Sequence, residues 1–124
     1  VRKYRYGPEV SDLGSPLHCI DTTPYDSTPD GAVIDSQGNL WVALVQRGAI
    51  ARFRPDGELD ALIDTPIDMP SSLGFGGKDM ATLFVTSIRS TGSGRAISRH
   101  PDAGHLFAIE DLGFQGIPEP RFRL

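Results

Sequence analysis

Asn-Leu-Trp-Val-Ala-Leu at residues 39–44 has a second, diverged copy at residues 82–87, Thr-Leu-Phe-Val-Thr-Ser. The two copies start 43 residues apart. Upstream of them, Pro-Asp-Gly-Ala-Val at 29–33 aligns with Pro-Ser-Ser-Leu-Gly at 70–74, at an offset of 41 residues. A period in the low forties that is built only of short strands is typical of one four-stranded blade of a β-propeller.

The downstream part of the repeat agrees but contains an insertion. Gly-Ala-Ile-Ala-Arg-Phe at 48–53 aligns with Gly-His-Leu-Phe-Ala-Ile at 104–109, at an offset of 56 residues. The second copy therefore carries a long polar loop at 88–103, which includes three arginines. Long loops on rigid scaffolds often serve binding, so this one could cover an anionic ligand, although a solvated, mobile loop is the favoured interpretation.

Turn signals divide the rest of the chain into short strands. Asp-Ser-Gln-Gly-Asn at 35–39 and Arg-Pro-Asp-Gly at 54–57 each separate two apolar runs, which indicates hairpins. Both alternating sets of side chains in 40–45 are apolar, as expected for a strand that is covered on both faces. Strands are predicted near residues 2–6, 17–21, 32–36, 39–45, 49–54, 59–63, 71–76, 82–87 and 104–109.

The predicted fold class is all-β, a partial β-propeller of roughly two and a half four-stranded antiparallel blades. Residues 1–28 would form the outer strands of a first blade, residues 29–69 a complete blade, and residues 70–124 the last blade and a tail. A propeller normally needs at least four blades to close its ring, so blade faces and strand edges are expected to be open here. We therefore expect a chain that is not a stable monomer: either upstream residues are missing, or copies associate into a homo-oligomer through open blade edges, or the form is unusual and open.

Composition narrows the classes of partner. The net charge of the 124 residues is −4, which disfavours nucleic acid, and no apolar run is long enough for a membrane-spanning helix. The single cysteine, Cys19, lies in an apolar run and is interpreted as a small buried hydrophobic residue rather than a reactive thiol. A chain with one cysteine and no secretion signal fits the cytoplasm.

An ordered set of motifs resembles one family. Pro-Asp-Gly at 29–31, followed by Asp-Ser-Gln-Gly-Asn-Leu-Trp-Val-Ala at 35–43, is similar to the penultimate blade of the regucalcin/gluconolactonase/luciferin-regenerating enzyme family. Pro-Ser-Ser-Leu-Gly-Phe-Gly-Gly-Lys-Asp at 70–79, Ala-Gly-His-Leu-Phe at 103–107 and Pro-Glu-Pro-Arg-Phe at 118–122 follow in family order. The resemblance covers essentially the whole chain and places it in the C-terminal part of the family's fold.

The resemblance implies a six-bladed propeller with a divalent metal on its central axis, and an activity on sugar lactones and related esters. The implied metal ligands are a glutamate near the N-terminus, an asparagine in a middle blade and the aspartate of the Pro-Asp-Gly motif. Only that aspartate has a counterpart here, Asp30, to which a catalytic role is also assigned. Departures are modest: His105 stands where glycine is common, and the turn at 46–47 is less rich in glycine.

Each candidate residue also has a simpler interpretation. Asp30 precedes a glycine and could be only a turn residue, although the resemblance favours the metal-facing role. A carboxylate ligand suits Ca²⁺ first, and also Mg²⁺ or Zn²⁺. Ser71 and Ser72 could line the central cavity or form a hydrogen-bonded turn. The three histidines match no metal-ligand spacing and are interpreted as structural or surface residues.

The function predicted is the C-terminal portion of a metal-dependent sugar-lactone or ester hydrolase, which would act on a small-molecule lactone or ester. By itself this portion does not constitute an active site, so whether the chain is an enzyme is left open. The alternative is a non-catalytic, self-associating binding module derived from a truncated propeller. The substrate, the identity of the metal, the true start of the protein and the number of chains in a closed ring are open at this stage.

Overall fold

The computed structural model describes residues 1–9, 12–94 and 96–121. It is built of short strands with two 3₁₀ turns and no longer helix among the described residues. In chain order the elements are β1 (Arg2–Lys3), β2 (His18–Cys19), η1 (Thr23–Tyr25), β3 (Pro29–Ile34), β4 (Leu40–Leu44), β5 (Ala49–Phe53), β6 (Leu59–Asp64), β7 (Pro70–Gly76), η2 (Lys78–Met80), β8 (Thr82–Ser87) and β9 (Leu106–Ile109).

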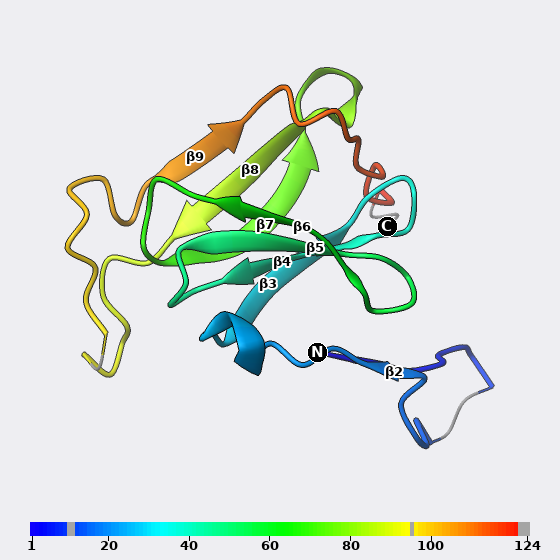
Figure 1. Cartoon of the computed structure of the whole chain (residues 1–124). Coiled ribbons are helices and arrows are strands. Elements are labelled where there is room, and N and C mark those ends of the chain that lie inside the picture. The colour runs from blue at the N-terminus through cyan, green and yellow to red at the C-terminus, as the bar shows by residue number, and fades with distance from the viewer. Residues whose placement is uncertain (10–11, 95, 122–124) are drawn as a thin grey trace.

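The strands form three antiparallel sheets in which neighbours along the chain are neighbours in space (Figure 1). β1 pairs with β2, β3 to β6 form a four-stranded sheet, and β7 to β9 form a three-stranded sheet. The prediction of an all-β chain of propeller type is confirmed. Most strand positions agree within a few residues, but β1 and β2 are only two residues long each, and β3 starts at Pro29 rather than near residue 32.

Glycines close the hairpins at the positions that the turn signals indicated. Gly38, between β3 and β4, and Gly57, between β5 and β6, have positive φ angles of 84° and 89°. Only glycine adopts this backbone region at little cost, so these two residues let the chain reverse tightly. Consecutive strands can therefore lie side by side, which produces the simple meander of both larger sheets.

The core lies between the two larger sheets. Trp41, Ala43 and Ile50 from the four-stranded sheet pack against a second group from the three-stranded sheet. That second group is Leu73, Leu83 and Val85, with Phe75 and Phe107 partly buried at its margin. The two larger sheets thus pack face to face through apolar side chains. This contact is the main hydrophobic core of the described residues.

The other face of β4 and β5 is also buried. Val42, Leu44 and Phe53 form a second cluster against Ile20 and Tyr25, which precede β3. The prediction that both faces of 40–45 are covered is therefore confirmed. The N-terminal segment takes the place of a neighbouring sheet on this side. The ribbon of β2 lies below the four-stranded sheet in Figure 1, and Arg2 and His18 line a pocket together with Ile34 and Leu40.

Strand direction defines two ends of the molecule. Pro29, where β3 starts, pairs with Leu44 at the end of β4, and Pro70, where β7 starts, pairs with Ser87 at the end of β8. β3 and β7 pack on each other at their first residues, so both sheets start at the same end, which we call the Asp30 end. The Asp30 end carries residues 45–48, 65–69, 88–94 and 96–105, and the opposite end carries residues 35–39, 54–58, 77–81 and 110–116.

Two surfaces differ from a closed globular protein. Cys19 is exposed, so its interpretation as a buried residue is wrong: the β1–β2 pair has only two strands and buries neither of its faces. On the three-stranded sheet, Thr86 and Leu106 lie side by side on the face turned away from the core, and Leu106 is 63% exposed. Thr86 and Leu106 are both exposed on this outward face.

A candidate metal ligand at the Asp30 end

Asp30 lies in a β-bulge at the start of β3. Pro29 pairs with Leu44 and Ala32 pairs with Val42, so β3 has one residue more than β4 over this stretch. The interpretation of Asp30 as a turn residue is wrong, because Pro29–Ile34 is a continuous strand. Bulges re-aim a side chain and are common next to functional sites, which gives the position of Asp30 a structural reason.

The start of β7 repeats this geometry. Pro70 pairs with Ser87 and Ser72 with Thr86, so β7 also carries an extra residue directly after a proline. Ser71 thus occupies the position in the second sheet that Asp30 occupies in the first, as the sequence repeat predicted. Ser71 and Ser72 lie in a strand rather than in a turn, and the Ser71 hydroxyl lies 2.9 Å from that of Thr86.

Gly31 brings the two bulges together. A β-carbon on Gly31 would lie 2.5 Å from Ser72 Oγ, 2.6 Å from its Cα and 2.8 Å from the carbonyl oxygen of Ser71. Two of these three atoms are backbone, so they cannot move aside cheaply. Gly31 is therefore the residue that allows β3 and β7 to approach each other at the bulge that carries Asp30.

The Asp30 side chain is exposed, and within the described part of the chain it has no hydrogen-bond or ion-pair partner. Its carboxylate is therefore free to bind a cation. A divalent ion needs more than this, since Ca²⁺ takes six to eight oxygen ligands. No group of three or more His, Cys, Asp or Glu side chains suited to a metal occurs among the described residues, so they fit one ligand of such a centre rather than the whole of it.

The histidines are placed as the sequence predicted. His18 is exposed on β2, and His105 is exposed before β9, with its Nδ1 3.9 Å from an Asp102 carboxylate oxygen. His100 lies in the 88–105 segment, where its Nδ1 accepts a hydrogen bond from the backbone N–H of Asp102. None of the three lies with Asp30 in a common group of ligands in the described residues.

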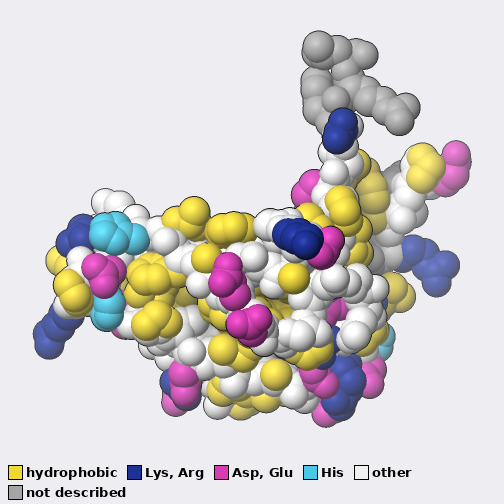
Figure 2. All heavy atoms as spheres, turned by 90° about the horizontal axis from the view of Figure 1, so that it is seen from above, with side chains coloured by type: hydrophobic (Ala, Val, Ile, Leu, Met, Phe, Trp, Pro, Cys, Tyr) yellow, Lys and Arg dark blue, Asp and Glu magenta, His cyan; other side chains and the backbone are white. Residues whose placement is uncertain are grey.

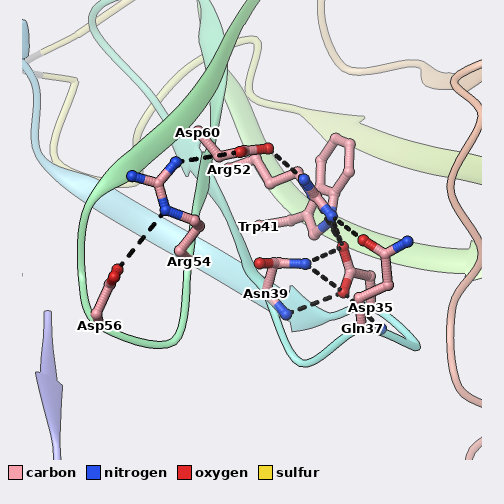
Figure 3. A network of polar contacts seen from close by, with 8 residues as sticks. All are labelled: Asp35, Gln37, Asn39, Trp41, Arg52, Arg54, Asp56 and Asp60. Atoms are coloured by element: carbon pink, nitrogen blue, oxygen red, sulfur yellow. Dashed lines mark hydrogen bonds and ion pairs between the residues drawn. The ribbon is translucent and has the colours of Figure 1, made fainter.

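A buried network at the opposite end was not expected from the sequence (Figure 3). Asp35 is 1% exposed and accepts hydrogen bonds from Trp41 Nε1 at 2.9 Å and from the side chain and backbone of Asn39. Arg52, 4% exposed, donates to the same carboxylate through Nε and Nη2 at 2.9 Å, and also bonds Gln37 and Asp60. Every described buried side-chain polar atom is satisfied.

Aromatic rings complete the enclosure of Arg52. The Arg52 guanidinium carbon lies 3.9 Å from the ring centroid of Phe114 and 5.6 Å from that of Trp41. Phe114 comes from the C-terminal tail, which also forms a bridge between Gly116 and Asp35. The network therefore ties the hairpin of the four-stranded sheet to the tail that follows the three-stranded sheet.

The network changes the acidity of Asp35. Burial disfavours the charged carboxylate, but the hydrogen bonds from Trp41, Asn39 and Arg52 outweigh it and hold the pKa of Asp35 below its ordinary value. A signal was present in the sequence, because Arg52 stands in the apolar run Ala-Ile-Ala-Arg-Phe. A charged residue inside a buried strand requires a paired partner.

Comparison with known proteins agrees with this fold and this placement of motifs. A family model described as the SMP-30/Gluconolactonase/LRE-like region matches residues 1–89. Regucalcin from Gallus gallus is 34% identical over 119 residues, and regucalcin from Oryctolagus cuniculus is 39% identical over 119 residues. Each alignment covers 95% of this chain and 40% of the regucalcin, so the chain spans about two fifths of the length of these relatives.

Two solved structures share the fold. A luciferin-regenerating enzyme superposes with a TM-score of 0.78 at 24% identity, over 98% of this chain and 41% of that enzyme. Regucalcin from Agrobacterium tumefaciens, described as a calcium-binding protein, superposes with a TM-score of 0.72 at 32% identity, over 90% of this chain and 39% of that protein.

The fold and the exposed Asp30 define part of a β-propeller with one candidate metal ligand. The chain belongs to the SMP-30/gluconolactonase/LRE-like family, as its motifs indicated. Within the described residues no helix is long and apolar enough to cross a membrane.

Proposed function

We propose that this chain supplies one carboxylate ligand, Asp30, to the divalent-metal centre of a lactone or ester hydrolase of its family, with the remaining ligands contributed by a longer propeller. The observation that carries the proposal is the bulged, exposed and unpartnered Asp30 held against β7 by Gly31. The calcium-binding regucalcin structure and the lactonase-type family support the choice of Ca²⁺ and of reaction class.

The chemistry follows from the residues at this end. When bound, a divalent ion would polarise the substrate carbonyl and make a water molecule more acidic. Asp30 would hold the ion and orient it, and the fixed backbone at Gly31 would keep its carboxylate from drifting. Ser71 and Ser72, at the matching bulge of β7, offer hydroxyls at the same end of the molecule, which suit a substrate rich in hydroxyl groups, such as a sugar lactone.

A calcium titration followed by NMR tests the ligand. We expect backbone signals of β3 and of the start of β7 to shift and saturate in a complete propeller that includes these residues, because the other ligands are then present, and Asp30→Asn to abolish the shift. Asp111→Asn is the matched control, because Asp111 is exposed at the opposite end and has a positive φ that asparagine also tolerates. Equal responses of the wild type and Asp30→Asn would contradict the proposal.

Hydrolysis is tested separately, in the same complete propeller. We expect Asp30→Asn to reduce the rate of lactone hydrolysis by about two orders of magnitude or more, since the residue touches the metal. The Asp111→Asn control should leave the rate unchanged. Loss of calcium binding without loss of hydrolysis would assign Asp30 a structural cation rather than a catalytic one.

Two further expectations remain proposals. The cytoplasm is proposed as the compartment because the chain has a single, exposed cysteine and no disulfide partner for it. Self-association into a homo-oligomer is proposed because the outward face of the three-stranded sheet presents Leu106 and Ala108 to solvent.

A further inference from the structure

Several hydrogen bonds and packing contacts hold the described residues of the 88–105 segment, 88–94 and 96–105, in place. Within the segment, Ser90 bridges Ile97, Ser98 N–H donates to the Arg89 carbonyl at 2.9 Å, and Ala103 is 1% exposed. At its base, the hydroxyl of Ser87 accepts from Gly104 N–H and donates to the His105 carbonyl, both at 2.9 Å. These contacts describe a folded excursion between β8 and β9, seen on the left of Figure 1.

Asp68 holds this excursion against the other sheet. The Asp68 carboxylate accepts the hydroxyl of Ser98 through Oδ1 and the backbone N–H of Arg99 through Oδ2 at 3.3 Å. Ser98 is 9% exposed and in turn accepts His100 N–H at 3.1 Å. Asp68 is fixed by its neighbours Ile67 and Met69, which are 2% and 6% exposed, so the carboxylate projects from a rigid connection.

The excursion and the four-stranded sheet border a wide, open cleft at the Asp30 end. The cleft has a volume of about 540 Å³ and is lined on one side by Arg47, Asp64 and Asp68, and on the other by Arg99 and His100. Figure 2 shows histidine, basic and acidic side chains gathered at the left end, where the excursion lies in Figure 1. The cleft therefore combines charged groups from both sheets.

Some charged groups of the cleft already have partners and others do not. Arg47 and Asp64 form an ion pair at 3.1 Å, and Asp68 is engaged by Ser98 and by the Arg99 backbone. Among the described residues the Arg99 guanidinium has no partner, although its backbone is held in place. The His100 imidazole has committed Nδ1 to Asp102 N–H, which leaves Nε2 free. The groups left to meet a ligand are thus a guanidinium and an imidazole.

We propose that this cleft binds a small anion, a carboxylate or phosphate group, through the Arg99 guanidinium, and that Asp68 is the positioning residue that presents Arg99. Guanidinium groups match carboxylate and phosphate oxygens in a planar, bidentate geometry. His100 Nε2 adds a second donor when it carries a proton. The site is distinct from Asp30, and its test uses no hydrolysis, so its failure and the failure of the proposed function are distinguishable.

The two aspartates of the cleft provide a test with opposite signs. Asp64→Ala removes a negative charge and releases Arg47, so it should tighten anion binding by roughly two- to fivefold. Asp68→Ala also removes a negative charge, but it frees the turn at 98–100. If Asp68 acts by positioning Arg99, its removal should weaken binding in spite of the lost repulsion. A purely electrostatic role would instead tighten binding, as in Asp64→Ala.

The measurement is an NMR titration of the whole chain with inorganic phosphate, repeated with acetate, and with chloride at matched ionic strength. We expect saturable shifts of Arg99 and His100 with phosphate or acetate and none with chloride. Arg99→Ala should weaken binding by roughly tenfold, and Arg5→Ala, an exposed arginine of the N-terminal segment, should not change it. A response to acetate alone would identify a carboxylate ligand, and a response to phosphate alone a phosphorylated one.

Limited trypsin digestion checks the positioning role by itself. Asp68→Ala should accelerate cleavage after Arg99 several-fold, whereas Asp64→Ala should not, because Asp64 makes no contact with the excursion that would hold it. The proposal is overturned if Asp68→Ala binds phosphate as tightly as the wild type or more tightly, or if Arg99→Ala retains full affinity.

Discussion

Asp30 lies near the start of β3 and Asp35 directly follows its end, and the two carboxylates have opposite environments. Asp30 is exposed and has no partner among the described residues, whereas Asp35 is 1% exposed and accepts hydrogen bonds from Trp41, Asn39 and Arg52. A carboxylate whose lone pairs are all occupied has nothing left to offer a ligand. The comparison therefore separates an end that stabilises the fold from an end that is available for binding.

The same contrast extends to whole ends of the molecule. At the opposite end, Phe114 from the tail covers Arg52, and the hairpin is closed by a tight turn. At the Asp30 end, a long excursion and an open cleft lie beside bulged strands. The residues that stabilise the fold and the residues that are available for binding thus lie at opposite ends of the molecule.

The largest expected effect is that of Asp35→Ala. Removal of the Asp35 carboxylate leaves the buried Arg52 with Asp60 as its remaining acidic partner and takes the acceptor away from Trp41 Nε1, which costs about 3–5 kcal/mol of unfolding free energy. Asp30→Ala should change that free energy by less than about 0.5 kcal/mol, since the side chain is exposed and away from such contacts. Urea unfolding of the two variants measures both values. Similar losses for the two would break the comparison.

Gly31→Ala comes next. The added methyl group would meet the backbone of Ser71 and Ser72 within 2.8 Å, so β3 and β7 must separate, at a cost of about 1–3 kcal/mol. Gly74→Ala is the matched control, because Gly74 lies on β7 and has no atom within 4 Å of its missing β-carbon. Thermal unfolding of both variants decides the matter. If the Gly74 variant loses as much stability, the close approach at Gly31 is not the cause.

The pH dependence of stability sharpens the role of Asp35. Its pKa is lower in the folded chain than in the unfolded chain, so its contribution is complete above the ordinary aspartate pKa of about 3.9. That contribution is lost as the pH falls further, through the folded-state value. Unfolding free energies measured between pH 6 and pH 2 should therefore fall steeply in the wild type and less steeply in Asp35→Asn.

The smallest effect on folding is expected for Leu106→Asp, which lies on the outward face of the three-stranded sheet. A charge at this exposed position should leave the fold intact but weaken self-association, because it places a carboxylate in an apolar contact. Light scattering of the wild type and the variant measures the mass of each in solution. A wild-type chain that is a compact monomer would contradict the proposal of self-association.

The repeat at 39–44 and 82–87 predicted the sheets well because strand signals are local. Alternating apolar residues bounded by glycine turns require no knowledge of distant contacts, so the hairpins around Gly38 and Gly57 were accurate. The motif resemblance also selected Asp30, yet sequence alone left a turn as its simpler interpretation. The bulge that excludes the turn arises from pairing with β4, which is a contact between separate segments.

Other features could not be read from local patterns. Cys19 has apolar neighbours in sequence, but the β1–β2 pair lacks a sheet to cover it. Asp35 looked like a hairpin residue until Arg52, 17 positions away in the chain, was seen to lie against it. The hold of Asp68 on Ser98 links positions 30 residues apart. Each of these depends on which side chains meet after the strands have paired.

The sequence by itself determined the class of fold, the order of the strands and the family, since short-range periodicity and ordered motifs carry that information. Tertiary structure alone decided which acidic residues are engaged and which are free. Burial and hydrogen bonding of a carboxylate depend on groups that folding brings together from distant positions. Two aspartates that are close in the sequence therefore acquire different roles only in the folded chain.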